Sequence, residues 1–426
     1  MASIFKASLF QKAGYIVSKR ILLITQWFDP EPTFKGLVFA RELVSRGFDV
    51  EVITGFPNYP GGKVYEGYKI KLIQKEIVNG VLITRVPLFP SHNKSKLGRS
   101  LNYLSFFFSS LIYGLFGSKR PDVIYAYHPP ITVALAAIII KFFRRAPVVI
   151  DIQDMWPDTL SATGLISNKY FLDIISNICN LIYRAVNKIV VLSPGFKNLL
   201  VDKGVLSEKI SLIYNWADEN ALKINREHQL NEISKTEGFN ILFAGNIGVA
   251  QDLNVILDAA LVLQKDFLKI NFFILGKGLM LEELKARTIN LGLNNVKFIP
   301  SVNMDEVGKF LNAADALFIH LKDDPLFKIT VPGKTQAYMC IGKPILMGVG
   351  GDAKNLMDEA NCGLHFQPEN PTSLVRAAKK FALLPENELQ NFGDNAAKFY
   401  EAKLSIKVGL DSFELIFNEV IENKHT

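Results

Sequence analysis

The 426-residue sequence predicts an α/β protein made of two doubly wound domains in tandem. Short apolar segments typical of buried strands alternate with helical patterns from residue 20 to about residue 400, as in parallel sheets covered by helices. A polar, charged segment from Asp218 to Gly238 interrupts this alternation. We therefore expect an N-terminal extension at 1–19, a first domain at 20–217, a second domain at 218–398 and a C-terminal helical segment at 399–426.

Composition excludes several classes of protein. The three cysteines lie in apolar contexts without C-x-x-C spacing, which argues against a disulfide framework or a zinc site and for a reducing cytoplasm. The formal charge of +7 is spread along the chain, which favours attraction to phosphate groups or an anionic bilayer. The sequence has no aromatic and basic motif for nucleic-acid recognition. The first residues lack the continuous apolar core of a secretory signal.

The first βαβ unit consists of a strand at 21–25, a helix from about residue 37 and a strand at 50–55. Ligands of parallel sheets bind at the carboxyl ends of the strands, so Lys35 and Gly36 are expected where a substrate would lie. The next loop contains Asn58 and Tyr59, and its proline and glycine content fits a surface turn or a substrate lid. Both interpretations stay open.

Residues 101–118 carry no charge and have lysine and arginine on both sides. This segment is at the lower limit for a bilayer-spanning helix, and its polar residues weaken that interpretation further. Spanning would also split the βαβ series across the membrane. A buried crossover helix and a helix lying in the membrane interface remain as alternatives.

Two further strands, at 122–128 and 147–152, deliver polar residues to the same edge of the predicted sheet. Asp154 is suited to bind sugar hydroxyls with the Trp156 ring stacked nearby, although it could instead cap the following helix. His128 follows a strand and is either structural or a group that orients a hydroxyl or phosphate.

The second domain repeats one arrangement twice. The strand at 239–245 leads into a glycine-containing turn from Gly245 to Asp252, and the strand at 270–278 places Lys277 at the same edge. Glycines there allow close backbone approach to phosphate, but the pattern is neither a Walker motif nor G-x-G-x-x-G. A solvated surface lysine is the alternative for Lys277. Asp323 and Asp324 are adjacent without further carboxylates, so we predict no obligatory metal.

The segment from Gly333 to Pro344 is the strongest local signal. It predicts a helix that begins after Pro332 and ends at Gly342, followed by a buried strand. A helix that begins in this way directs unpaired backbone N–H groups and the positive end of its dipole at what lies in front. This arrangement suits a diphosphate.

These pieces, taken in order, resemble retaining GT-B glycosyltransferases of family four, in particular the bacterial branch that builds O-antigen and capsule repeat units on a polyprenyl carrier. The matching segments are the loops at 29–32 and 57–60, Asp154-Met155-Trp156-Pro157, Val191-Leu192-Ser193, Tyr214 to Asp218, Phe243 to Asn246, Leu275 to Gly278 and Pro332 to Pro344. Each motif is weak alone, but their order is specific.

The resemblance implies two Rossmann-like domains facing a central cleft. It also implies a hexosyltransferase or N-acetylhexosaminyltransferase with a nucleotide-sugar donor, an N-acetylated or deoxy sugar, and a polyprenyl-diphosphate-linked acceptor. UDP is the expected nucleotide and GDP the alternative. No cofactor or metal is implied, and the expected place is the cytoplasm, peripherally on the inner membrane. A C-terminal helix around 413–423 is expected to pack on the first domain.

The resemblance also assigns roles to residues. Asp154, Lys277 and Asn246 are the expected catalytic residues. The expected donor-binding residues are Gly245, Gln251, Gly276, Pro332, Gly333, Lys334, Thr335 and Gln336, and the expected acceptor-binding residues are Lys35, Gly36, Asn58, Tyr59, His128 and Trp156.

Two positions depart from the family pattern. The usual pair of glutamates falls on Ile329 and Ala337, so the carboxylate expected to hold the ribose hydroxyls is missing, and Gln336 is a candidate substitute. The histidine often found after the strand at 148–152 is replaced by Gln153. Two alternatives therefore stay open: a nucleotide-sugar epimerase of the same architecture, and a non-catalytic sugar-binding homologue.

Overall fold

The computed structural model describes residues 18–91, 96–128, 131–162, 168–223, 232–266 and 268–423. Contacts divide the chain into two compact units. The first contains residues up to Asp151, the short stretch 185–187 and the chain from Phe417 onward, and the second contains the remainder.

The first sheet has eight strands in the order β3-β4-β2-β1-β5-β6-β7-β8. Its central strands are parallel: Leu23 of β1 lies opposite Val52 of β2 and Tyr125 of β5. These central strands are apolar on both faces, as in a sheet covered by helices. The strands are β1 (Arg20–Ile24), β2 (Asp49–Gly55), β3 (Gln74–Val78), β4 (Val81–Val86), β5 (Val123–His128), β6 (Val148–Ile152), β7 (Lys188–Val191) and β8 (Ile210–Leu212).

The edge of this sheet is an antiparallel hairpin of β3 and β4 that the sequence analysis did not predict. Asn79 and Gly80 form its turn with φ values of 51° and 82°. Positive φ at both central residues is the hallmark of a type I′ turn, for which Asn-Gly is the preferred pair.

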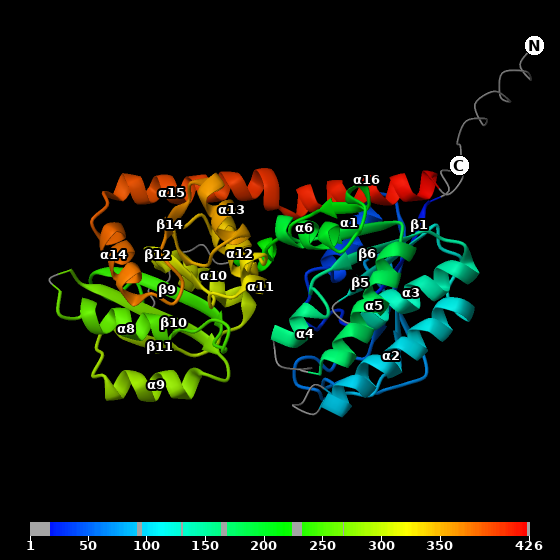
Figure 1. The fold of residues 1–426 in the computed structure, drawn as a ribbon, viewed down its shortest axis with the longest axis horizontal. Coiled ribbons are helices and arrows are strands. Elements are labelled where there is room, and N and C mark those ends of the chain that lie inside the picture. Colours follow the sequence, from blue (N-terminus) through cyan, green and yellow to red (C-terminus); the bar gives the residue numbers. More distant parts are fainter. Residues whose placement is uncertain are drawn as a thin grey trace, which may run out of the picture. The chain divides into compact units, whose positions relative to one another are not determined.

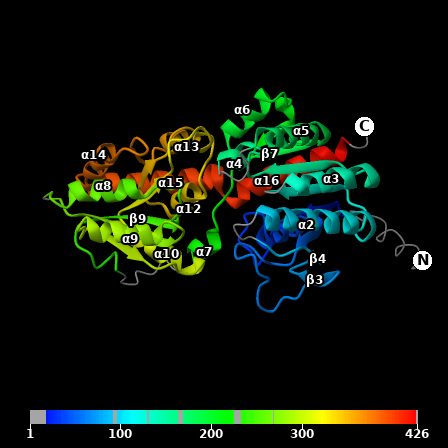
Figure 2. The ribbon, with the colours of Figure 1, turned by 60° about the horizontal axis from the view of Figure 1, so that its bottom comes forward.

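The helices that precede β9 (Phe239–Asn246) along the chain are α1 (Leu37–Ser45), α2 (Lys96–Phe116), α3 (Ile131–Arg144), α4 (Asp158–Ala162), α5 (Lys169–Ala185), α6 (Pro194–Asp202) and α7 (Glu219–Lys223), with the 3₁₀ turn η1 (Ser207–Lys209). Figures 1 and 2 show α2 and α3 side by side. α2 contains the uncharged segment. Phe106, Ser110 and Tyr113 are buried, whereas Phe108 and Ile112 are exposed, so α2 is neither fully buried nor fully exposed. Among the described residues, no helix is long and apolar enough to cross a bilayer.

The second sheet has six parallel strands in the order β11-β10-β9-β12-β13-β14. Alternate residues of each strand enter different cores: Phe243 packs with α8, α9 and α14, and Leu242 with α10, α12, α13 and α15. Figure 1 shows helices on both faces of this sheet. The strands are β9 (Phe239–Asn246), β10 (Ile270–Lys277), β11 (Val296–Ile299), β12 (Ala316–His320), β13 (Ile345–Gly348) and β14 (Gly363–His365).

The helices that follow β9 along the chain are α8 (Asn254–Leu263), α9 (Leu281–Asn290), α10 (Met304–Ala313), α11 (Pro325–Lys328), α12 (Gly333–Ile341), α13 (Asp352–Ala360), α14 (Pro371–Ala382) and α15 (Glu386–Phe399), then the π-helical turn η2 (Tyr400–Leu404) and α16 (Ile406–Glu422). Phe417, near the end of α16, contacts the rings of Tyr125 and Phe48 in the first unit. The prediction of two Rossmann-like doubly wound sheets is confirmed.

Candidate functional site

The carboxyl ends of β9 and β10 lie side by side, and Gly245 pairs with Gly276 and Asn246 with Lys277. The backbones of these two strands approach so closely that a Cβ on Gly276 would lie 1.9 Å from the Gly245 carbonyl oxygen. Gly276 has a φ of 146°, a conformation that side chains disfavour. The side chains of Asn246 and Lys277 are exposed at this edge, as the sequence predicted.

The predicted helix is α12, and its observed bounds match the prediction. Pro332 is its N-cap residue, and Gly342 ends it in the left-handed conformation with a φ of 75°. Tyr338 holds α12 against β9, because its hydroxyl accepts from the Ala244 N–H at 3.0 Å and also lies 3.3 Å from the Ala244 carbonyl oxygen. The first turn of α12 is thereby fixed relative to Gly245.

Lys334, in that first turn, reaches the end of β9. Its Nζ lies 4.7 Å from the centroid of the Phe243 ring. A Cβ on Gly245 would lie 2.7 Å from Lys334 Cε and 2.9 Å from Nζ, so the glycine provides the space that the lysine occupies. Burial lowers the pKa of Lys334 to about 8. No described carboxylate forms an ion pair with Lys334. Its ammonium group is therefore a buried cation that lacks a counter-charge.

The next two residues of α12 are also short of partners. Thr335 and Gln336 are buried, and Thr335 Oγ1 and Gln336 Oε1 form no hydrogen bond with the described residues. A buried polar atom without a partner is costly and rare in folded proteins. Lys334, Thr335 and Gln336 therefore form a continuous stretch of groups with unused bonding capacity.

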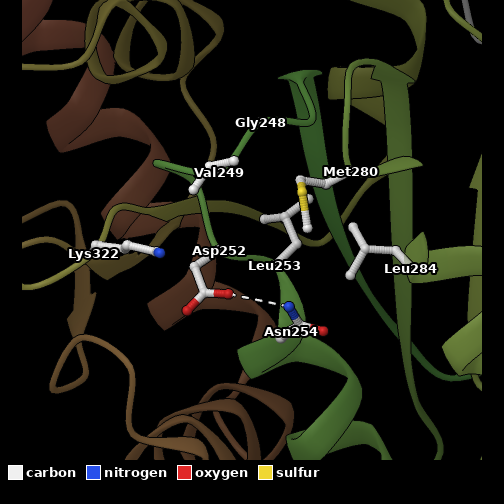
Figure 3. A pocket seen from close by; sticks show the side chains of 8 residues that line it. All are labelled: Gly248, Val249, Asp252, Leu253, Asn254, Met280, Leu284 and Lys322. Atoms are coloured by element: carbon white, nitrogen blue, oxygen red, sulfur yellow. Dashed lines mark hydrogen bonds between the residues drawn. The ribbon is translucent and has the colours of Figure 1, made fainter. Parts of the chain in front are cut away.

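The loop after β9 is organised by Gln251. Its Oε1 accepts from the Gly248 N–H at 3.1 Å and from Asn246 Nδ2 at 3.4 Å. A cavity of about 110 Å³ lies beside this loop, lined by Gly248, Val249, Asp252, Leu253, Asn254, Met280, Leu284 and Lys322 (Figure 3). That volume is below the roughly 300–1,000 Å³ of small-molecule pockets, so this cavity is not large enough for a nucleotide sugar.

The two positions where the family pattern has glutamate have packing roles. The Ile329 carbonyl accepts from Ser193 Oγ at 2.5 Å, and a Cβ on Gly195 would lie 2.5 Å from Ile329 Cβ. Ala337 is a partly buried residue packed against the core on one face of the second sheet. Neither position has a group that could bind ribose hydroxyls.

Asp154 and Trp156 lie in the turn between β6 and α4, and both are partly buried. The alternative role of Asp154 as a helix cap is wrong, because α4 begins four residues later at Asp158. Burial raises the pKa of the Asp154 carboxyl. Gln153 accepts a hydrogen bond from Asn215 Nδ2 at 2.7 Å, so the residue that replaces the family's histidine contacts another predicted motif.

Lys35 is in the interior of the first unit. It is 1% exposed, its Nζ lies 3.9 Å from Asp151 Oδ2, and Asp151 also accepts from the Tyr125 hydroxyl at 2.7 Å. Burial lowers the pKa of Lys35 to about 8, and Asp151 opposes this shift. In this position Lys35 has a structural role. Its acceptor-binding role stays a prediction, and the buried side chain does not support it. Gly36 lies beside Asp29, whose Oδ2 accepts from the Leu37 N–H at 2.5 Å.

Glu31 is a residue that the sequence analysis did not assign to the site. Its Oε1 accepts from the N–H groups of Asn58 and Tyr59, both at 2.7 Å, so the carboxyl holds the predicted acceptor loop. Tyr59 in turn stacks on Trp27 with ring centroids 4.5 Å apart. Burial raises the pKa of Glu31 to about 7 despite these hydrogen bonds. The only feature of the sequence that could have indicated a role for Glu31 is its position in the Asp-Pro-Glu-Pro loop.

We expect Glu31 to make stability depend on pH. Its pKa is 4.5 in the unfolded reference and about 7 in the folded protein, so the fold favours the protonated form. Stability of the first unit should fall as pH rises from about 4.5 to 7 and then level off, since burial disfavours the charged form. Glu31→Gln, which cannot ionise, should remove this decline in urea unfolding measured across that range. An equal slope in both proteins would contradict the assignment.

The remaining predictions concern His128 and metal binding. His128 ends β5, but its side chain lies outside the described residues. No cluster of three or more metal-ligating side chains occurs among residues that the structure describes.

Two family models match the chain in succession. The glycosyl transferase 4-like domain matches residues 37–216, and the glycosyl transferases group 1 family matches residues 225–399. Residues 217–224, which lie between the two matches, overlap the start of the predicted linker.

Relatives and solved structures agree with these matches. The putative colanic acid biosynthesis glycosyl transferase WcaI of Escherichia coli is 24% identical over 359 residues, covering 81% of this chain and 87% of its own. The structure of Anabaena HepE in complex with UDP and glucose has a TM-score of 0.67 at 17% identity and covers 94% of this chain and 100% of its own. WaaG, a glycosyltransferase involved in lipopolysaccharide biosynthesis, has a TM-score of 0.59 at 15% identity over 93% of this chain and 99% of its own.

Proposed function

Because the chain is a glycosyltransferase of the GT-B type, we propose that it transfers a sugar from a UDP-sugar donor. The proposed acceptor is a saccharide linked to polyprenyl diphosphate, and the proposed process is surface polysaccharide synthesis. The similarity to WcaI supports a role in polysaccharide synthesis, and the UDP complex of HepE supports the choice of nucleotide. The sugar is proposed to be an N-acetylated or deoxy hexose, transferred with retention of its anomeric configuration.

The single observation that supports donor binding most strongly is Lys334. An ammonium whose pKa burial lowers to about 8, with no described ion-pair partner, lies at the N-terminus of α12 beside Gly245. A diphosphate would provide the missing counter-charge and would accept hydrogen bonds from the first N–H groups of α12. Thr335 and Gln336 add unpartnered oxygens next to this position. We propose that Gln336 takes over hydrogen bonding where the family's glutamate is absent.

The proposed reaction breaks the bond between the sugar C1 and the β-phosphate oxygen and forms a bond from C1 to an acceptor hydroxyl oxygen. The hydroxyl proton passes to an oxygen of the leaving diphosphate, so no protein base is needed. Negative charge builds on the β-phosphate as the bond breaks. Lys334, Lys277 and the α12 amides are the groups proposed to stabilise it. No metal is proposed, and Asp154 is proposed to orient acceptor or sugar hydroxyls.

The outer face of α2 supports the membrane part of the proposal. Six large apolar side chains spaced along one side of this helix are 43–83% exposed: Leu97, Leu101, Leu104, Phe108, Ile112 and Phe116. We call this set the α2 ridge. Phe142 and Phe143 at the end of α3 are 80% and 67% exposed. A continuous exposed apolar strip of this kind marks an interaction surface.

Charge around the α2 ridge indicates which surface it contacts. Between Glu76 and Asp151 the sequence has nine Lys and Arg residues but only one acidic residue, Asp122, so this stretch has a local excess of positive charge because acidic residues are scarce in it. Lys119, Arg120 and Arg145 are exposed at the ends of α2 and α3. Apolar and basic groups together favour an anionic bilayer. On its buried face, α2 holds the acceptor loop, because Asn102 Nδ2 donates to Asn58 Oδ1 at 3.3 Å.

We expect Phe108→Ser combined with Ile112→Ser to abolish flotation of the protein with vesicles containing anionic lipid. Both side chains are more than half exposed, so folding should be affected little. Wild type should float with anionic vesicles and less with neutral ones. The matched control is Ile289→Ser combined with Leu383→Ser, two exposed apolar residues of the second unit, which should leave flotation unchanged. Equal flotation of both double variants would argue against the α2 ridge.

The proposed function as a whole is tested by offering a panel of UDP- and GDP-sugars to membranes that contain the protein and detecting lipid-linked product by mass spectrometry. A lipid-linked saccharide longer by one sugar is the expected result. Donor consumption without an acceptor would instead indicate an epimerase. Donor binding without product under any acceptor would indicate a non-catalytic homologue.

A further inference from the structure

His320, the last residue of β12, lies in the interior of the second unit and is 1% exposed. Its ring stacks with Phe366 at 5.8 Å between centroids and with Phe318 at 6.2 Å. A Cβ on Gly348 of the neighbouring strand would lie 2.7 Å from His320 Cδ2. The imidazole therefore has a single position, set by aromatic neighbours and by a close backbone approach.

Both ring nitrogens have defined roles. Nδ1 lies 2.7 Å from the carbonyl oxygen of Gln251, which can only accept, so Nδ1 carries a proton. The Glu369 N–H donates to Nε2 at 2.9 Å, so Nε2 is an acceptor. The neutral imidazole with its proton on Nδ1 is the form that satisfies both contacts.

These contacts join two segments that flank the proposed diphosphate site. Gln251 organises the loop from Asn246 through its side chain, as described above. Glu369 has a φ of 55°, a strained conformation for a residue other than glycine, and its Oε2 accepts from the Asp323 N–H at 2.7 Å. Asp323 begins the segment that leads through α11 to α12. One ring therefore links the β9 loop to the approach to α12.

We propose that His320 is a positioning residue for the nucleotide-sugar donor, which holds the loop from Asn246 to Gln251 and the segment at Asp323 in the arrangement that binds the diphosphate. This inference rests on the proposed function and names a residue that the predicted site does not contain. His320 does not contact the donor itself. It acts through Gln251 on one side and through Glu369 on the other.

The same geometry predicts a pH dependence. The charged groups that act on the ring are Asp252 and Glu369, and both favour protonation, but burial opposes it more strongly and lowers the pKa of His320 below its ordinary value of 6.5. Protonation would place a proton on Nε2 facing the Glu369 N–H. The stabilising contribution of this contact should therefore be fully present above pH 6.5 and decline as pH falls toward the lower pKa of the folded protein. Donor affinity should decline as pH falls through that lower pKa.

The test measures UDP binding by titration calorimetry in three variants whose folding is checked by circular dichroism. His320→Phe keeps the ring stack and loses both hydrogen bonds, so the Kd for UDP should rise about tenfold or more. His320→Asn can still donate to the Gln251 carbonyl and should have an intermediate effect. Glu369→Ala leaves the ring intact and removes the contact with Asp323, so a smaller increase in the Kd for UDP is expected. This variant provides the test if His320→Phe does not fold.

The pH profile separates positioning from simple structural damage. Protonation of the terminal phosphate of UDP near pH 6 should weaken binding in every variant, but wild type should lose UDP affinity more steeply below about pH 6.5 than His320→Phe does. The matched control is His365→Asn, a histidine of the neighbouring strand β14 whose Nε2 has no hydrogen-bond partner among described residues, and it should retain the wild-type profile. Wild-type affinity and pH profile in folded His320→Phe would overturn the inference. Failure of wild type to bind any nucleoside diphosphate would overturn the proposed function itself.

Discussion

Lys334→Ala should lower sugar transfer at least about a hundredfold while the melting temperature stays unchanged or rises. The ammonium of Lys334 lies beside Gly245 without a described ion-pair partner, and burial lowers its pKa to about 8. In the free protein this group is unfavourable, because the contact of the cation with the Phe243 ring compensates its desolvation only in part. Removing it should therefore relieve the fold and weaken the stabilisation of the leaving diphosphate. The measurements are turnover with saturating donor and thermal unfolding.

The charge of Lys334 also predicts how donor binding depends on pH. The ammonium form attracts phosphate, and the group loses its proton as pH rises through about 8, so wild-type affinity for UDP should decline above that pH. The alanine variant should bind weakly at every pH.

Two lysines serve as comparisons for Lys334→Ala. Lys343 follows the opposite end of α12, is also partly buried and has Asp315 nearby, so Lys343→Ala should retain turnover. Lys277→Ala should reduce turnover less than Lys334→Ala, because Lys277 is exposed and its charge is already solvated. A turnover in Lys334→Ala equal to that of Lys343→Ala would exclude Lys334 from the site.

The second domain could be predicted in detail because its signals are local. Pro332 before the helix, Gly342 after it and the apolar strand that follows specify α12, and the glycines after β9 and β10 mark the edge of the sheet where the backbones approach. The exposed positions of Asn246 and Lys277 follow directly from the register of two adjacent parallel strands. Such features depend on a few consecutive residues, which the sequence contains in full.

Other features depend on contacts between distant segments. The sequence could not show that Lys35 is paired inside the sheet with Asp151, because 116 positions separate them. The same holds for Glu31, whose importance comes from the N–H groups of Asn58 and Tyr59, and for His320, whose two partners come from different loops. The β3–β4 hairpin is a different case. Its Asn79-Gly80 turn is a local signal, because Asn-Gly is the preferred pair of a type I′ hairpin, so this element is predictable from a few consecutive residues.

Phe417→Ala should destabilise the first unit by about 3–5 kcal/mol, the usual cost of removing a fully buried phenylalanine ring. Phe417 is 0% exposed and makes edge contacts with Tyr125 at 5.4 Å and Phe48 at 6.3 Å between ring centroids. Tyr125 in turn donates to Asp151, the carboxylate that lies near Lys35. The loss should therefore extend from the end of α16 to the buried ion pair, and urea unfolding measures it.

Leu415 provides the matched control, since it belongs to the same helix and is 72% exposed. Leu415→Ala also truncates a large apolar side chain and keeps the helix propensity high, but the side chain is exposed, so the change in the free energy of unfolding should be less than about 0.5 kcal/mol. If α16 contributed only its own helical stability, the two substitutions would have similar effects. A large difference between them shows instead that the final turns of the chain are part of the core of the first unit, where Phe417 fixes the position of Tyr125 and, through it, of Asp151.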